Sequence, residues 1–461
     1  MLFSCLLALL CVVLAALLRS RLLFVIAVVC WVQNILLPWW YTKGWVSESS
    51  AHSLLLVKEA LLLFLVVYGA WMARRVTRFP LPWPIRWALL YGTYISVRLV
   101  LGMVVLREPL FDELRLVRSM LFPVETIVAG FLVGVLAPRI APGYERFVIW
   151  GLTACAVVSL LLYFTASHTF WVNDVNIALY NVNVKGDPEW TVLPELGVSG
   201  SGVGREVFGA LSAFRLIGTF GDPLTAGMVL AAGLLLVAAR DRLTAEWLAV
   251  GCVLAGALFF TFSRSAWVFA TVGFMYLSLV QRRLARLGVF VAAAATLWFA
   301  LAGLREFLSS SVAAFDLQAG DVYHAQGILT FYSSAILNPS YLLGAGPIDP
   351  SAQSWVLENG LAYMLVQFGV PAVVCFVGVC LSAERYLRHA ARSSGTLAVA
   401  GAACAVSTLI AANLSFYALS FTAYYGIWSI VGLATGAAFR VRMQGVEARA
   451  RERPITATAS L

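Results

Sequence analysis

The chain has 461 residues, of which 61% are apolar and only 12% are charged, and its formal net charge is +9 at pH 7. Soluble domains carry about a quarter charged residues, so this composition excludes an ordinary water-soluble domain. The apolar runs are long and unbroken, which favours helical spans of ~20 residues over the alternating strands of a membrane barrel. We therefore predict an all-α, polytopic integral membrane protein.

Hydropathy predicts roughly 12–13 transmembrane helices. In chain order they are Leu2–Leu18, Leu22–Pro38, Leu54–Met72, Trp83–Leu106, Leu114–Leu136, Phe147–Phe164, Leu224–Ala239, Trp247–Phe262, Ala266–Val280, Leu287–Leu304, Val356–Leu381, Gly395–Ala412 and Phe416–Ala438. The first run has no basic segment before it and no small-residue cleavage site after it. We expect it to be a retained span and not a cleaved signal.

The spans and their connections divide the chain into regions. These are N-terminal helices (1–165), a first long loop (166–206), central helices (207–304), a second long loop (305–355), C-terminal helices (356–438) and a tail (439–461). Both long loops are rich in aromatic residues, which is atypical of disordered segments. We expect them to fold over the outer mouth of the bundle, and we expect a loose tail from Glu447 onward.

Arginines collect on every second connection between the spans. They are Arg74, Arg75, Arg78, Arg139, Arg146, Arg240, Arg242, Arg282, Arg283, Arg286, Arg385, Arg388, Arg392, Arg440 and Arg442. By the positive-inside rule, these connections are cytoplasmic and both long loops face the other side of the membrane. This distribution explains most of the positive net charge, so no nucleic-acid partner is expected.

The sequence offers no pattern typical of a metal or nucleotide site. All eight cysteines lie in predicted spans, which favours packing over a disulfide framework. The four histidines are scattered, and neither HExxH, CxxC nor a glycine-rich phosphate loop ending in Lys-Ser/Thr occurs. We expect no metal and no other cofactor.

The stretch RLIGTFGDPLTAG, which begins at Arg215, stands where the first long loop meets an apolar run. Its Gly218 permits close backbone approach. Asp222 suits a helix N-cap and Pro223 suits the first helical turn. The start of the following helix would then offer N–H groups to an anion.

A second arginine, Arg264, stands in TFSRSAW at the outer end of a later span. The positive-inside rule does not call for cations on that side. Two arginines facing one outer cavity predict a phosphate clamp, because a guanidinium binds phosphate oxygens through two N–H groups. The alternative is that Arg215 and Arg264 extend to lipid headgroups or pair with Asp222 and Glu206.

Both stretches, followed by LNPSYLLGAGP from Leu337 and ENGLAYMLVQFGVPAVV from Glu358, resemble the signature of the O-antigen ligase and O-antigen polymerase superfamily. The resemblance is detailed over 215–374, and earlier spans match only in hydropathy. It implies a GT-C-like, multi-pass enzyme of the bacterial inner membrane whose active site faces the periplasm. Such enzymes transfer glycan from a polyprenyl-diphosphate-linked donor without a metal.

The resemblance also assigns roles to residues. Arg215 and Arg264 match the arginines thought to bind the donor diphosphate, and Asn359 matches the asparagine of the family. Where the family usually has a histidine, this chain has Glu358. The expected substrate-binding residues are Asn359, Gly218, Asp222 and Tyr323, the last by stacking on sugar.

The base that accepts the proton of the acceptor hydroxyl is open between Glu358, His324 and Asp349. A carboxylate or an imidazole can do this within hydrogen-bond reach. Glu358 and His324 are the catalytic candidates. Glu358 could equally be a carboxylate that the positive end of a helix stabilises.

Further charges lie inside predicted spans, and such residues are functional hypotheses by default. Arg98 and Arg118 could extend the diphosphate site. Alternatively, Lys58 with a carboxylate, or Arg118 with Glu125, could form structural pairs.

Together these observations predict an inverting membrane glycosyltransferase that takes its donor from membrane lipids. A polymerase of exopolysaccharide, capsule or O-antigen would extend another lipid-linked repeat, whereas a ligase would glycosylate lipid A-core. The glutamate at position 358 tilts the prediction to a polymerase, and a chain-length regulator could be a partner. The alternative is a flippase or secondary transporter of lipid-linked glycans, although no internal repeat is found.

Overall fold

The computed structural model describes residues 11, 13–14, 17–74, 80–106, 110–166, 170–184, 204–206, 212–214, 216–261, 263–282, 342–344, 359–413 and 421–452. Its helices are η1 (Arg19–Arg21), α2 (Leu22–Thr42), α3 (Glu48–Leu55), α4 (Val57–Ala73), α5 (Trp83–Leu101), η2 (Gly102–Leu106), α6 (Leu110–Leu136), η3 (Pro138–Ile140), α7 (Ala141–Thr165), η4 (Phe170–Val175), α8 (Ile177–Asn183), η7 (Gly218–Phe220), α9 (Pro223–Ala238), α10 (Ala245–Phe260), α11 (Arg264–Gln281), α16 (Gly360–Phe368), α17 (Val370–Ala411) and α18 (Phe421–Glu452). Two short strands, β1 (Gly204–Glu206) and β2 (Ser212–Phe214), pair antiparallel.

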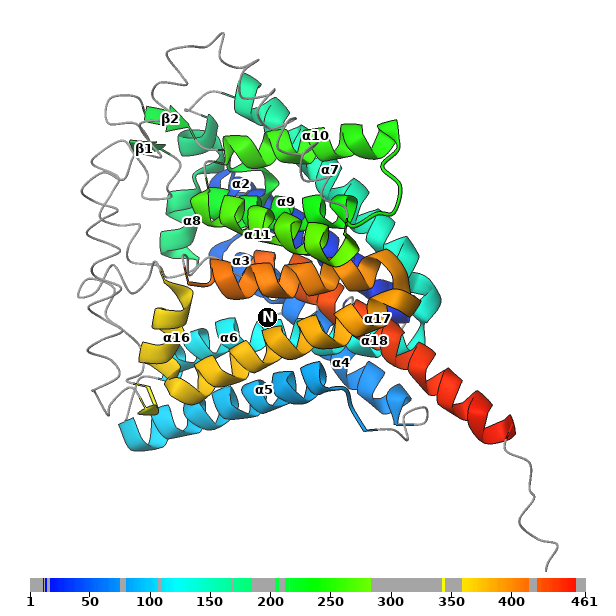
Figure 1. Cartoon of the computed structure of the whole chain (residues 1–461). Coiled ribbons are helices and arrows are strands. Elements are labelled where there is room, and N and C mark those ends of the chain that lie inside the picture. Colours follow the sequence, from blue (N-terminus) through cyan, green and yellow to red (C-terminus); the bar gives the residue numbers. More distant parts are fainter. Residues whose placement is uncertain are drawn as a thin grey trace, which may run out of the picture.

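The fold is an all-α bundle of a polytopic membrane protein, as the composition predicts (Figure 1). Within the described residues, six helices are long and apolar enough to cross a membrane. They occupy Arg19–Thr42, Glu48–Ala73, Trp83–Val104, Val117–Leu136, Pro138–Thr165 and Val370–Ala391. Shorter apolar helices occupy Pro223–Ala238, Ala245–Phe260, Ser265–Gln281 and Gly395–Ala411. The expected span Leu287–Leu304 and most of Leu2–Leu18 lie outside the described residues.

The structure changes some of the predicted boundaries. The single span expected over Val356–Leu381 is divided at Gly369, whose φ of +82° ends α16 and lets α17 start in a new direction. The tail expected to be loose from Glu447 is helical as far as Glu452. Its alanine, arginine and glutamate residues are strong helix formers, which extends α18 beyond the apolar stretch.

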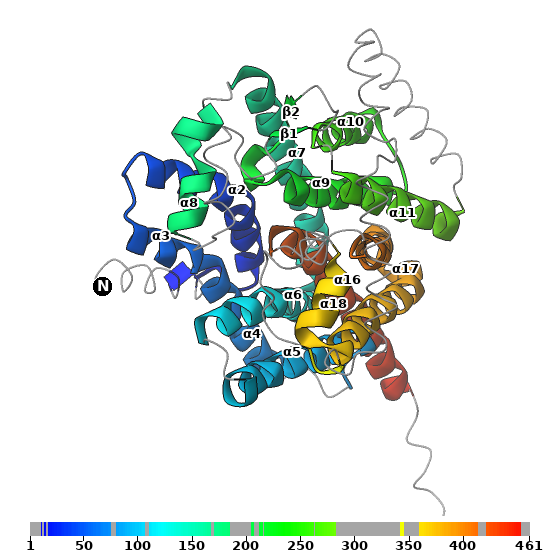
Figure 2. The ribbon, with the colours of Figure 1, turned by 90° about the vertical axis from the view of Figure 1, so that its left-hand side faces the viewer.

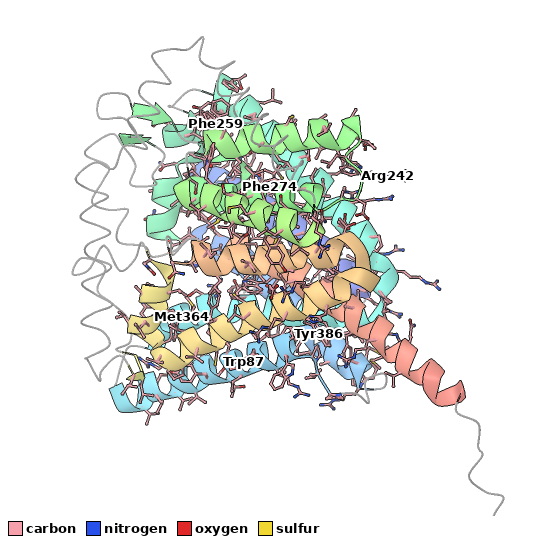
Figure 3. All side chains as sticks on the ribbon, in the orientation of Figure 1. Trp87, Arg242, Phe259, Phe274, Met364 and Tyr386 are labelled. Atoms are coloured by element: carbon pink, nitrogen blue, oxygen red, sulfur yellow. The ribbon has the colours of Figure 1, made fainter. Side chains whose placement is uncertain are left out.

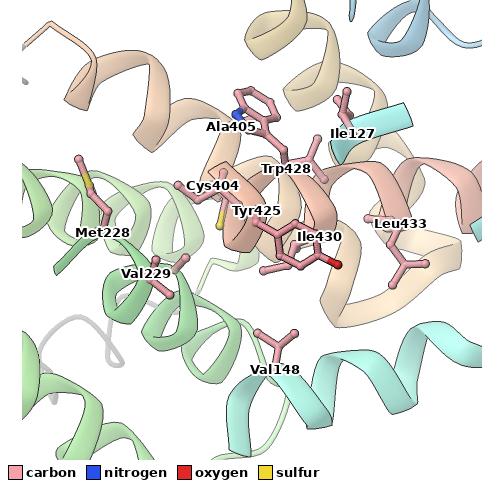
Figure 4. Packing of buried hydrophobic residues seen from close by; sticks show 14 of the residues in the cluster. Ile127, Val148, Met228, Val229, Cys404, Ala405, Tyr425, Trp428, Ile430 and Leu433 are labelled. Atoms are coloured by element: carbon pink, nitrogen blue, oxygen red, sulfur yellow. The ribbon is translucent and has the colours of Figure 1, made fainter. Parts of the chain in front are cut away.

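Helix α18 lies at the centre of the bundle (Figures 2 and 4). Its Tyr425, Trp428 and Leu433 are buried among side chains from α6, α7, α9 and α17. The labelled neighbours in Figure 4 are Ile127, Val148, Met228, Val229, Cys404 and Ala405. The Tyr425 hydroxyl donates to the carbonyl of Leu23 at 2.5 Å, which ties α18 to α2.

Arg240 and Arg242 of one basic connection and Arg388 near another lie toward the same end of the bundle, here called the basic end. There Arg240 donates to Glu145 at 2.9 Å, which joins the end of α9 to the start of α7. Gln281 donates to the carbonyl of Ala239 at 2.9 Å, and Tyr276 donates to Glu384 at 2.8 Å. Figure 3 shows Arg242 and Tyr386 toward this end and Phe259 and Met364 toward the opposite one.

Candidate functional site

The two arginine-containing stretches meet at the end opposite the basic end, here called the motif end. Gly227, the last residue of the first stretch, packs against the second. A Cβ added to Gly227 would lie 2.7 Å from the Cβ of Ala266, 3.0 Å from that of Ser263 and 3.1 Å from Oγ1 of Thr261. Leu216, which follows Arg215 in the sequence, donates its N–H to the carbonyl of Phe260 at 2.8 Å. The fold thus joins the starts of α9 and α11.

Gly218 makes the close backbone approach that the sequence predicts. Its φ is +58°, and an added Cβ would lie 2.0 Å from Oγ of Ser159 on α7. The neighbouring N–H of Thr219 donates to that hydroxyl at 3.3 Å. The partner of this turn is therefore a side chain of the bundle, and contact of Gly218 with substrate stays a prediction.

Asp222 is the N-cap of α9, as predicted, and Pro223 is the first residue of the helix. The Oδ2 atom of Asp222 accepts the N–H of Thr225 at 2.6 Å. A carboxylate therefore already occupies part of the position where the sequence analysis expected an anionic ligand. The N-cap of α11, in contrast, is the uncharged Ser263.

Arg264 is the first residue of α11, and its side chain lies outside the described part of the structure. The N-cap before it is Ser263, whose Oγ accepts the N–H of Ala266 at 3.4 Å. Ser263 and Thr261 are completely buried. The backbone that carries Arg264 is therefore held firmly against α9.

Asn359 has a structural role that the sequence did not indicate. It is the N-cap of α16, where its Oδ1 accepts the N–H of Ala362 at 2.9 Å. Its Nδ2 donates to the carbonyl of Asn413 at 2.7 Å, beyond the end of α17. Asn359 is only 1% exposed, so it holds the start of α16 in place. Its predicted contact with substrate is not tested by this geometry.

Five other residues that the sequence analysis proposed for the site lie outside the described residues. They are Arg215, Tyr323, His324, Asp349 and Glu358. Trp171, an aromatic residue of the first long loop, is buried in a small cluster with Val175, Ile177 and Ile217. Its ring is therefore a packing element of the motif end.

Arg98 lies near the motif end of α5 and is only 2% exposed. Its charge interacts with the hydroxyl group of Tyr94, one helical turn earlier. A diphosphate could reach Arg98 only after neighbouring side chains moved apart. Its predicted role in donor binding remains a prediction that this conformation does not favour.

Arg118 forms a two-pronged ion pair with Glu59 on α4, and its interaction with the predicted partner Glu125 is the longer-range attraction of the two charges. Its Nε donates to Oε2 of Glu59 at 2.6 Å, and its Nη2 donates to Oε1. Lys58, for which a carboxylate partner was expected, donates to Oε1 of Gln33 on α2 at 3.0 Å. Consecutive helical residues point about 100° apart, so Lys58 faces α2 while Glu59 faces α6.

Replacing Glu59 by glutamine should destabilise the protein by ~1–3 kcal/mol, because the charge of Arg118 would lose its counterion inside a span. This is less than the ~3–5 kcal/mol typical of broken buried pairs, since the Arg118 side chain is 40% exposed. The double variant Glu59→Gln/Arg118→Gln should recover part of the loss. The measurement is the fraction of monodisperse protein left after heating in detergent.

The matched control is Asp174→Asn, which breaks the pair between Lys43 and Asp174 at 2.6 Å. Both side chains of that pair are more than a third exposed, so the expected effect is below ~1 kcal/mol. Equal effects of Glu59→Gln and Asp174→Asn would show that the pair within the span is not stabilising.

Two features of the motif end were missed by the sequence analysis. One is the pair of Glu59 with Arg118. The sequence signal for it was Glu59 itself, an acidic residue inside a neighbouring predicted span. The other is the contact between Leu342–Gly344 and the junction of α16 and α17, where each partner contributes a glycine, Gly344 and Gly369. No protein-family model and no curated protein matches the chain.

Proposed function

We propose that the chain is a glycosyltransferase of the bacterial inner membrane that uses a polyprenyl-diphosphate-linked glycan as donor on the periplasmic face. The acceptor is another lipid-linked glycan, as in polymerases of exopolysaccharide, capsule or O-antigen, or the lipid A-core of a ligase. The observation that carries this proposal is the contact between the two arginine-containing stretches at the motif end, through Gly227, Ser263 and Ala266.

The position of Arg264 supports a role in binding an anion. A cation in the first turn of a helix opposes the helix dipole and costs about 0.3–1 kcal/mol. The dipole of α11 therefore disfavours an arginine at this position. An anionic ligand would make the arginine favourable there, because both the guanidinium and the positive end of the helix dipole would attract the ligand.

In the proposed reaction, the acceptor hydroxyl oxygen attacks the anomeric carbon of the donor sugar. The bond from that carbon to the diphosphate oxygen breaks, and polyprenyl diphosphate leaves with the electron pair. Glu358 or His324 accepts the hydroxyl proton. Arg215 and Arg264 stabilise the charge that grows on the leaving group, which is commonly the largest contribution to such catalysis. One direct displacement inverts the anomeric centre.

The proposed orientation predicts the results of reporter fusions. Reporters inserted in 176–203 and 309–339 should read as periplasmic, and reporters near Arg283 and Arg388 as cytoplasmic, because the arginines mark the inner side. A substituted-cysteine labelling experiment in intact cells measures the same property. A cytoplasmic result for 309–339 would place the candidate bases in the wrong compartment and contradict the proposal.

The activity itself is tested with purified protein and the lipid-linked glycan isolated from cells that lack this chain. Without nucleotide, nucleotide-sugar or divalent metal, and with EDTA present, the protein should lengthen the glycan and release polyprenyl diphosphate. No release, together with movement of the glycolipid across liposomes that contain the protein, would favour a flippase or transporter. Empty liposomes are the control for movement.

A further inference from the structure

Segments that are far apart in the sequence meet at the motif end of α5. The hydroxyl of Tyr94 on α5 donates to the carbonyl of Phe368, the last residue of α16, at 2.6 Å. The same hydroxyl lies 3.5 Å from the carbonyl of Leu343, in the described part of the second long loop. Tyr94 thus touches both the α16–α17 junction and the loop that precedes α16.

Two glycines allow this contact. Gly344 and Gly369 have φ values of +87° and +82°. A Cβ added to Gly344 would lie 2.3 Å from the carbonyl oxygen of Gln367, and one added to Gly369 would lie 2.5 Å from that of Leu342. The obstructing atoms belong to the backbone, so no change of rotamer would relieve the clash. The loop and the junction are in contact backbone to backbone.

Apolar packing contributes little to holding this part of the loop. The side chains of Leu342 and Leu343 are 59% and 58% exposed. The described contacts of the segment Leu342–Gly344 are its backbone contact with Gly369 and the contact of Leu343 with the hydroxyl of Tyr94. The same hydroxyl bonds more closely to Phe368 at the end of α16, so it touches both sides of this backbone contact.

The other end of α16 is fixed as well, because Asn359 ties it to the carbonyl of Asn413. The nine-residue helix is thus held at both ends, by Asn359 and by Tyr94. Both candidate bases belong to the segments attached here: Glu358 directly precedes Asn359, and His324 lies in the loop that contains Leu343.

We propose that Tyr94 is a positioning residue that fastens α16 and the segment Leu342–Gly344 to α5, and thereby sets the choice between the acceptor hydroxyl and water. This inference rests on the proposed function. A donor sugar that meets water is hydrolysed: the water oxygen bonds to the anomeric carbon, polyprenyl diphosphate leaves, and the base takes the water proton. If α16 shifts, the adjoining candidate base Glu358 shifts with it, and a water molecule then competes better with the acceptor hydroxyl.

The test compares Tyr94→Phe with Tyr68→Phe. Tyr68 lies on α4, where its ring packs on Phe64 and Trp71, so its substitution also removes one hydroxyl from a half-buried ring. With the lipid-linked glycan as both donor and acceptor, the ratio of lengthened glycan to hydrolysed glycan is measured in the same reaction. This ratio does not depend on the fraction of active protein.

Tyr94→Phe should shift the ratio about fivefold toward hydrolysis, the effect of losing one hydrogen bond, and Tyr68→Phe should leave it unchanged. Amide hydrogen exchange of the peptide that contains Leu342–Gly344 gives a second, activity-independent readout. Exchange should become about fivefold faster in Tyr94→Phe only.

The outcomes separate the two proposals. If the wild-type protein consumes no donor, the proposed function fails, and hydrogen exchange still decides whether Tyr94 fastens the loop. Unchanged exchange in Tyr94→Phe would overturn the fastening. Faster exchange with an unchanged ratio in an active enzyme would overturn the role in choosing between acceptor and water.

Discussion

Gly436→Ala in α18 should prevent the accumulation of folded protein, whereas Gly445→Ala in the same helix should not. A Cβ added to Gly436 would lie 2.1 Å from the carbonyl oxygen of Phe131 on α6, and nothing lies within 4 Å of one added to Gly445. The two substitutions make the same chemical change in the same helix. Only the contact with α6 differs.

The large effect follows from how α6 and α18 pack. Gly130 and Gly134 of α6 face Gly432 and Gly436 of α18, and the obstacle at every one of these glycines includes backbone atoms. Small residues four apart are what allow membrane helices to approach this closely. A methyl group would force the helices apart along the whole contact, at a cost of ~3 kcal/mol or more.

The measurement is the yield of monodisperse protein in detergent and its survival on heating, at matched expression. Gly445→Ala should equal the wild type or gain up to ~1 kcal/mol, because alanine is the better helix former. Comparable yields of Gly436→Ala and Gly445→Ala would mean that α6 and α18 are not in this close contact.

The parts of the fold that the sequence predicted are those with a local physical cause. A span is visible because ~20 apolar residues in a row have few other uses. The cap at Asp222 is visible because the acid, the proline and the apolar run are adjacent in the sequence. Such signals need no knowledge of which helix lies beside which.

The errors arose where the answer depended on neighbouring helices. Arg118 and Glu125 lie on one helix and made a reasonable pair, yet Glu59 on α4 offers the bidentate geometry. Likewise, the break at Gly369 was not predicted, although Pro371 follows it and stands in the first turn of α17. Hydropathy does not reveal the contact of Gly369 with the backbone of Leu342–Gly344.

For the candidate site, the sequence predicted the neighbourhood better than the roles. The two arginine-containing stretches do pack together through Gly227. Asn359, however, acts on the backbone of α16 and Asn413, a use of an asparagine side chain that only the tertiary contact shows. Local motifs predict helix starts well, but they do not say whether a polar side chain faces a ligand or another segment.

Arg264→Lys should slow glycan transfer by about 30- to 1,000-fold, and Arg215→Lys should do the same. Lysine keeps the charge but loses the planar pair of donors that matches two phosphate oxygens. Losing such a contact to a leaving diphosphate costs on the order of 2–4 kcal/mol of transition-state stabilisation. At the start of α11, lysine would suffer the same unfavourable dipole as arginine, so folding should be little changed.

The matched control is Arg242→Lys, in the exposed connection between α9 and α10 at the basic end, where a lysine can serve the positive-inside rule equally well. Its transfer rate should equal that of the wild type. Glu358→Gln should also be slow, but with unchanged donor affinity, because it would remove a base and not a diphosphate contact. Transfer rate and donor affinity are therefore measured for each variant at equal amounts of monodisperse protein. If Arg264→Lys transfers glycan as fast as Arg242→Lys, the guanidinium at the start of α11 does not bind the diphosphate, and the contact between α9 and α11 serves packing alone.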